Sequence, residues 1–153
     1  MRTAPDREPQ PRLDWSSPRN PHVRALRALL DRRERAHAGR AVVTGVRLVE
    51  TALRLGRAEE LLLVPEAGPE VDRLAQQAEE LRVPVRWVSR RVVEAVSAVK
   101  TPQPAAAVVR VPEVVPLSRL RWRWLVVADG LQDPGNLGAL VRTAHAAGFD
   151  AVV

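Results

Sequence analysis

Helix-like spacing of apolar residues begins at His22, where four apolar side chains fall on one face of a helix. This pattern predicts a helix from residue 22 to about residue 37, ending near Gly39. Ser89 is a favourable N-cap for another helical segment, because its hydroxyl can accept a bond from a free backbone N–H. The further predicted helices cover residues 46–55, 71–81 and 89–98.

Short apolar runs alternate with these helices. The runs predict strands at residues 41–44, 60–64, 85–88 and 105–111. Alternation of strands and helices indicates an α/β domain with a largely parallel sheet over residues 22–112. Residues 1–21 are rich in Pro, Arg and polar groups, and we expect them to form a flexible extension.

A second unit follows a linker at residues 113–121, marked by Pro112 and Pro116. Residues 122–153 predict a strand, a polar loop, a helix and the start of another strand. So short a βα unit cannot bury a core by itself. We therefore expect residues 122–153 to be the first part of a truncated domain that exposes an apolar sheet edge.

Composition narrows the class of protein. The chain is 46% hydrophobic and 27% charged, as in globular proteins, and its 3% aromatic content leaves Val, Leu and Ala to build the core. The absence of Cys excludes disulfides and thiolate metal sites, and three scattered His argue against zinc. No apolar run approaches the roughly 20 residues of a membrane helix, and no secretion signal is evident. The expectation is a cytoplasmic protein without a metal or a membrane partner.

The net charge of +6 points to a polyanionic partner. A GC-rich genome can explain why Arg replaces Lys at every basic position except Lys100, but it does not explain the positive total. Eight Arg lie between residues 19 and 47, against two acidic residues in the helical segment. They predict a phosphate-contacting face, and a merely solvated helix face is the alternative. The candidate RNA-contacting residues are Arg24, Arg27, Arg32, Arg33, Arg35 and Arg47, with Arg90, Arg91 and Lys100 as an extension.

The richest stretch for chemistry is residues 129–147, a tight polar turn between a strand and a helix. Residues 137, 140, 141 and 144 form an apolar stripe, and Arg142 falls opposite it, free to face a ligand or only solvent. Asn136 is expected at the N-cap, and capping alone would explain it. Gly138 costs helix stability, and close approach of the backbone to another element or to a ligand would compensate. The absence of a Gly-x-Gly-x-x-Gly pattern and of a phosphate-loop lysine argues against dinucleotide or ATP binding.

The segment Asp-Pro-Gly-Asn-Leu-Gly at 133–138, followed by Arg-Thr-Ala at 142–144, closely resembles the first motif of the SpoU (TrmH-like) RNA ribose 2'-O-methyltransferases. The N-terminal part is similar to the substrate-binding domain of that family, at residues 20–26, 32–35, 42–50 and 101–103. The resemblance covers about residues 20–153. One departure is Thr44, where the family usually has Glu.

The resemblance implies an N-terminal L30e-like α/β domain that grips RNA. It implies that residues 122–153 are the first βα unit of an incomplete trefoil-knotted (SPOUT) methyltransferase domain, a domain that binds S-adenosylmethionine and dimerises. Arg142 would help orient the target and activate the ribose 2'-hydroxyl, and Asn136 would support that site. The later family motifs are absent, so we expect a fragment with no cofactor-binding residues of its own, and a homodimer formed through the missing knot.

The resulting hypothesis is an RNA methyltransferase that transfers a methyl group from S-adenosylmethionine to a ribose 2'-hydroxyl of rRNA or tRNA, with this chain inactive alone. The alternative is a non-catalytic L30e-like RNA-binding module. Residues 129–147 separate the two, because a pure binding module has no need of them. A nucleotide-binding α/β enzyme unrelated to RNA is disfavoured by the distribution of Arg.

Overall fold

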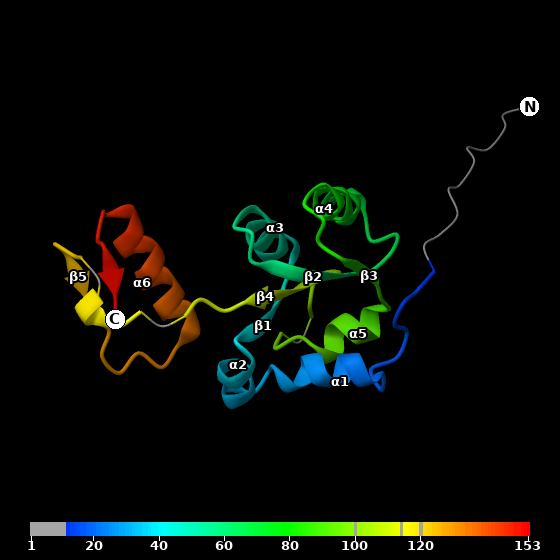
Figure 1. The fold of residues 1–153 in the computed structure, drawn as a ribbon, viewed down its shortest axis with the longest axis horizontal. Coiled ribbons are helices and arrows are strands. Elements are labelled where there is room, and N and C mark those ends of the chain that lie inside the picture. Colours follow the sequence, from blue (N-terminus) through cyan, green and yellow to red (C-terminus); the bar gives the residue numbers. More distant parts are fainter. Residues whose placement is uncertain (1–11, 100, 114, 120) are drawn as a thin grey trace, which may run out of the picture. The chain divides into compact units, whose positions relative to one another are not determined.

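The computed structural model describes residues 12–99, 101–113, 115–119 and 121–153. The chain divides into two compact units, unit 1 (Met1–Glu113) and unit 2 (Val114–Val153), which are described separately. Unit 1 contains four strands and five helices among its described residues (Figure 1). Its elements in chain order are α1 (Pro21–Ala28), α2 (Arg32–Ala38), β1 (Arg40–Thr44), α3 (Val46–Arg54), β2 (Ala58–Leu63), α4 (Pro69–Glu80), β3 (Val85–Trp87), α5 (Arg90–Ala95) and β4 (Ala105–Arg110).

The sheet of unit 1 has the strand order β1-β4-β2-β3. β4 pairs antiparallel with β1 and with β2, whereas β2 and β3 pair in parallel. The prediction of a largely parallel sheet is therefore wrong in its pairings, although β1, β2 and β3 run in the same direction. The reason is that β4 begins at the edge of the sheet where β2 ends, since Ala105, its first residue, pairs with Leu63, the last residue of β2.

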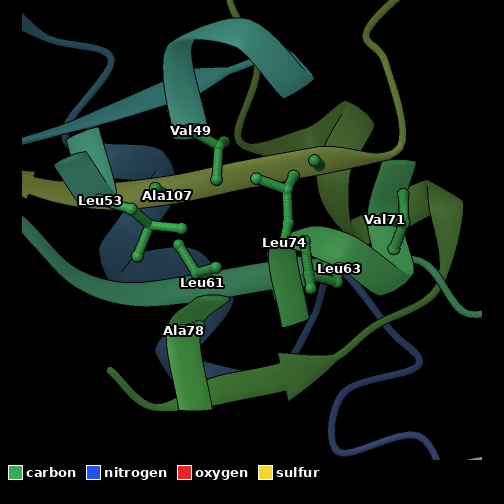
Figure 2. Packing of buried hydrophobic residues seen from close by; sticks show 9 residues of the cluster. Val49, Leu53, Leu61, Leu63, Val71, Leu74, Ala78 and Ala107 are labelled. Atoms are coloured by element: carbon green, nitrogen blue, oxygen red, sulfur yellow. The ribbon is translucent and has the colours of Figure 1, made fainter. Parts of the chain in front are cut away.

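Helices cover both faces of this sheet, with α3 and α4 on one face and α1 and α5 on the other (Figure 1). On the first face, side chains of α3 and α4 pack on Leu61 and Leu63 of β2 and on Ala107 of β4 (Figure 2). Leu62 points the opposite way and joins Val23 on the second face, as the two-residue period of a strand requires. Two apolar clusters thus stabilise unit 1, each fully buried Leu contributing about 1.5–3 kcal/mol.

The single helix expected over residues 22–37 is two helices. α1 ends at its C-cap Leu29, and Asp31 begins α2 by accepting bonds from the backbone N–H of Arg33 at 2.7 Å and of Glu34 at 3.3 Å. An Asp side chain satisfies free N–H groups at a helix start, so the chain breaks where apolar spacing alone predicts continuity.

Part of the expected flexible extension is fixed to the sheet. The Asp14 N–H donates to the carbonyl of Trp87 at 2.8 Å, and the Trp87 N–H donates to the Asp14 carboxylate, also at 2.8 Å. The Ser89 hydroxyl donates to the carbonyl of Ser16 at 2.8 Å. The segment is ordered because it supplies partners to the open edge of β3, a need that composition does not reveal. Residues 1–11 lie outside the described part of the chain.

Unit 2 contains a short 3-10 helix (Leu117–Arg119), β5 (Leu125–Val126), α6 (Pro134–Ala146) and β6 (Ala151–Val152) among its described residues. β5 and β6 pair in parallel, and α6 connects them along the chain. Both strands are shorter than the sequence predicts, and Ala144 is the one buried hydrophobic residue described in this unit. The Asp150 carboxylate accepts the backbone N–H of Arg123 at 2.7 Å and of Trp124 at 2.9 Å, and these hydrogen bonds lower the pKa of Asp150.

Candidate functional site

The turn before α6 is built by local hydrogen bonding. Asp133, and not Asn136, is the N-cap, and its carboxylate accepts the backbone N–H of Asn136 at 2.7 Å. Pro134 occupies the first helical turn, where its missing N–H costs nothing. A Cβ at Gly135 would lie 2.9 Å from the Asp133 Oδ1, so only glycine leaves room for the capping carboxylate. Helix initiation therefore accounts for Asp133, Pro134 and Gly135.

Asn136 and Arg142 have no such structural explanation. Both residues are exposed, and within the described residues no hydrogen bond or ion pair engages either side chain. Arg142 reaches back toward the start of α6, because helical side chains lean toward the N-terminus. Its Nη1 lies 3.2 Å from where a Cβ of Gly138 would be. This neighbour belongs to the same helix, so the predicted approach of another element to Gly138 is not seen among the described residues, and the approach of a ligand stays a prediction.

The apolar stripe of α6 is only partly covered. Ala144 is buried and Leu140 is half-buried, whereas Leu137 and Val141 remain 42% and 45% exposed. Leu137 and Val141 stay exposed because the described part of unit 2 offers only two short strands to pack against. Arg142 is exposed as predicted.

A second constellation lies in unit 1, at the edge where β1, β2 and β3 end and β4 begins. Gln103 Oε1 accepts the backbone N–H of Val46 at 2.9 Å and so caps α3 from a distant part of the chain. Gly45 has φ +108°, and a Cβ there would lie 3.2 Å from the same oxygen. Thr44 and Ser97 hydroxyls are 3.3 Å apart in a hydrogen bond. Two stretches of family resemblance, at 42–50 and 101–103, therefore meet here. Sequence reasoning did not single out Gln103 as a site residue, although the Thr-Pro-Gln match contained the signal.

The predicted arginine face divides into separate parts. Arg35 uses its Nη1 to bind the carbonyls of Leu29 at 3.0 Å and Leu30 at 2.6 Å, so it holds the break between α1 and α2. Helix spacing does not reveal this contact, because it crosses a turn. Arg47 lies on α3, which covers the opposite face of the sheet from α1. Of the six candidates, Arg24, Arg27, Arg32, Arg33 and Arg47 are exposed and unpaired within the described residues. Arg90 and Arg91 of the predicted extension are exposed as well, and Lys100 lies outside the described residues.

Glu59 engages two further arginines. Its carboxylate pairs with Arg40 and, at 3.2 Å, with Arg110. Burial raises the pKa of Glu59, but hydrogen bonds and charge attraction from the two arginines outweigh burial and lower the pKa below its usual value. Arg40 is therefore part of a structural ion pair between β1, β2 and β4, not part of a free basic surface.

The described residues contain no group of three or more His, Asp or Glu side chains that could hold a metal ion. No helix among them is long and apolar enough to cross a membrane.

Comparison with known proteins shows the family of the chain. The model of the MRM3-like substrate-binding domain matches residues 20–107. The chain belongs to this family. The match covers most of the sheet of unit 1, the Gly45–Gln103 contact and the six candidate RNA-contacting arginines.

Relatives of this MRM3-like chain are RNA methyltransferases. The chain is 35% identical over 138 residues to the 23S rRNA (guanosine(2553)-2'-O)-methyltransferase RlmP of Bacillus subtilis, covering 90% of this chain and 52% of that protein. A solved RNA 2'-O ribose methyltransferase is 34% identical with a TM-score of 0.72, covering 90% of this chain and 53% of its own. The SpoU methyltransferase AviRb of Streptomyces viridochromogenes, solved with AdoMet, is 26% identical with a TM-score of 0.72 over 88% of this chain and 52% of its own.

The chain therefore has the mixed α/β fold of SpoU methyltransferases. It spans about half the length of the curated relatives it matches.

Proposed function

We propose that this chain comprises the substrate-binding domain and the first part of the catalytic domain of an RNA 2'-O-methyltransferase. In this proposal unit 1 is the L30e-like RNA-binding domain, residues 113–121 are the linker, and residues 122–153 begin a trefoil-knotted domain that dimerises. The substrate is rRNA or tRNA in the cytoplasm. The family match, together with relatives named as RNA methyltransferases, supports the assignment.

The observation that carries the proposal is the start of α6. Capping explains Asp133, whereas the side chains of Asn136 and Arg142 stay exposed and unengaged within the described residues. Capping requires neither an Arg at position 142 nor a Gly at position 138. The Arg142 side chain lies over Gly138 without a partner among the described residues, and Gly138 itself weakens the helix. We assign Asn136 and Arg142 to the catalytic site on this ground.

The chemistry follows from the hydrogen-bonding groups of a guanidinium. Its five N–H groups are all donors and it has no acceptor, so Arg142 does not take the proton of a ribose 2'-hydroxyl. Its contribution is electrostatic, because a positioned cation stabilises the negative charge that develops on the ribose oxygen as its proton moves to a neighbouring RNA phosphate. The Asn136 amide can both donate and accept hydrogen bonds, which suits it to orient the ribose.

The methyl donor in the proposal is S-adenosylmethionine, which supplies an activated methyl group when bound. Around α6 the side chains are largely exposed, with Ala144 alone buried among the described residues of unit 2. These residues do not by themselves enclose a molecule of that size. We therefore assign no cofactor-binding residue within this chain.

RNA binding is assigned to unit 1. Arg24, Arg27, Arg32 and Arg33 present unpaired guanidinium groups from α1 and α2, and Arg47 presents one from the first turn of α3. Arginine matches phosphate with two parallel hydrogen bonds, and such contacts weaken with salt.

The test is methyl transfer by the full-length protein with labelled S-adenosylmethionine on unmodified rRNA and tRNA. We expect Arg142→Ala to lower kcat by at least tenfold with little change in the affinity for RNA, because the lost interaction forms with developing charge. Arg142→Lys should recover part of the rate. Arg119→Ala, which removes another arginine of unit 2, is the matched control.

A full rate with Arg142→Ala would remove the catalytic assignment. RNA binding without methyl transfer by the wild-type full-length protein would favour the alternative, a non-catalytic L30e-like module. The unpaired arginines of α1 and α2 support that alternative equally well, whereas α6 does not.

A further inference from the structure

An aromatic pair lies where segment 12–20 leads into α1. The ring centroids of Trp15 and His22 are 5.6 Å apart, and the two ring planes differ by 3°. The Arg86 guanidinium carbon lies 5.8 Å from the centroid of Trp15 and adds a cation above the indole. None of these three residues belongs to the motif at α6 or to the arginines assigned to RNA.

The pair is held in place by bonds on both sides. The Trp15 carbonyl accepts the backbone N–H of Ser89 at 3.1 Å, and the indole packs against the cluster beneath α1 and α5. The His22 N–H donates to Asn20 Oδ1 at 2.8 Å, which fixes the start of α1. Arg86 Nε in turn donates to Glu60 Oε1 at 2.8 Å. Trp15 is half-buried whereas His22 is exposed, so an ordered imidazole faces solvent on a fixed support.

Charges of both signs lie near this pair. Arg86 is hydrogen-bonded to Glu60 and is also attracted by Asp14. Ser89, bonded to Trp15 and to Ser16, is followed directly by Arg90 and Arg91. Both arginines are exposed, and no hydrogen bond or ion pair of their side chains occurs within the described residues. Their place next to Ser89 in the sequence makes them candidates for contacting phosphates of an RNA strand bound at this segment.

We propose that His22, supported by Trp15, is a stacking site for an unpaired base of the RNA substrate. The inference rests on the proposed function, since it names the part of the RNA that unit 1 recognises. Bases within an A-form helix are stacked on each other and inaccessible, whereas loop bases stack on aromatic side chains. A ring already held by its neighbour loses little conformational entropy when a base covers it.

The experiment measures binding of the 153-residue chain to two RNAs, a hairpin with an unpaired loop and a fully paired duplex of equal charge. Fluorescence anisotropy at several KCl concentrations gives the affinity and its salt slope. We expect His22→Ala to weaken hairpin binding about fivefold to a hundredfold, as loss of one stacked base does, with unchanged duplex binding and an unchanged salt slope. His22→Phe should restore binding.

Two control variants separate stacking from charge. His37→Ala removes an exposed histidine of α2 that has no ring partner within the described residues, and it should leave both affinities unchanged. Arg91→Ala should weaken hairpin and duplex alike and reduce the salt slope by about 0.7–0.9, because it removes a phosphate contact.

Equal hairpin affinity for wild type, His22→Ala and His37→Ala would overturn the stacking site while leaving RNA binding intact. Failure of the wild-type chain to bind either RNA would instead overturn the assignment of unit 1 to RNA binding, and the stacking site with it. A second measurement needs no variant. Base stacking should shift the NMR resonances of the His22 ring protons upfield on addition of the hairpin, and unchanged His22 resonances in an RNA-bound chain would refute the site.

Discussion

The two units show opposite ways of holding a polar loop in place. In unit 1, the loop at Gly45 is fixed by Gln103, a residue far along the chain, above a sheet with buried clusters on both faces. In unit 2, the loop before α6 is fixed by Asp133, whose carboxylate accepts the backbone N–H of Asn136 three residues later, and Ala144 is the one buried hydrophobic residue among the described residues of the unit. The first arrangement depends on tertiary packing, and the second depends on local sequence.

This contrast explains why the most specific motif of the chain lies in its least packed part. The Asp-Pro-Gly-Asn turn encodes its own geometry through capping, so it forms without a large core. The RNA-binding assignment of unit 1, in contrast, relies on a scaffold that positions arginines from separate helices.

The largest effect should come from the core of unit 1. Leu62→Ala removes a fully buried side chain from the cluster beneath α1 and α5, and we expect a loss of about 2–5 kcal/mol in the free energy of unfolding. Leu137→Ala in unit 2 removes a side chain that is 42% exposed, and we expect a change within about 0.5 kcal/mol. Urea titration followed by circular dichroism measures both. Equal losses would mean that α6 packs as tightly as the core of unit 1.

An intermediate effect is expected at the long-range loop. Gly45→Ala places a side chain at φ +108° and against Gln103 Oε1, and it should cost about 1–3 kcal/mol. Gln103→Ala relieves the contact but leaves the Val46 N–H uncapped, at a cost of about 1 kcal/mol. Thermal unfolding distinguishes the variants. If Gly45→Ala is harmless, the backbone at this loop does not require glycine, and the link between the two stretches is weaker than its geometry indicates.

The smallest expected effect raises the stability of α6 and lowers the rate of methyl transfer. Gly138→Ala should stabilise α6 by about 0.5–1 kcal/mol through helix propensity, yet lower methyl transfer severalfold in the full-length protein, because its Cβ displaces the Arg142 guanidinium. Ala139→Gly is the matched control, since it should destabilise the helix by a similar amount and leave the rate unchanged. A Gly138→Ala enzyme that is both more stable and fully active would show that Arg142 does not need its observed position.

Most elements of the fold could be predicted from the sequence, because apolar spacing marks each helix and strand locally. The strand order could not be predicted, since the position of β4 between β1 and β2 depends on contacts between distant residues. The break at Asp31 was missed because the charged residues 31–35 are compatible with a continued, solvent-facing helix, so the role of Asp31 as an N-cap is not evident from spacing. The correct cap of α6 was marked in the sequence by Pro134, which favours the first helical turn and so identifies Asp133 as the residue before it.

The candidate site could be predicted in part. The motif singles out Arg142 and Asn136, and their catalytic role stays a prediction, whereas the capping role expected of Asn136 belongs to Asp133. Arg35 was grouped with the RNA-binding residues because charge patterns do not reveal that its guanidinium is already bound to two carbonyls. The His22–Trp15 pair could not be found from spacing, since it joins a helix to a segment that composition describes as unstructured.

The position of β4 also sets the order in which unit 1 can be completed during synthesis. β1 pairs with β4 alone, and β4 is the last strand of the unit to leave the ribosome. At roughly 5–20 residues per second, β1 emerges several seconds before its partner. During that interval the nascent chain carries an apolar strand with no neighbour, a state in which chaperones bind and premature pairing with other chains begins.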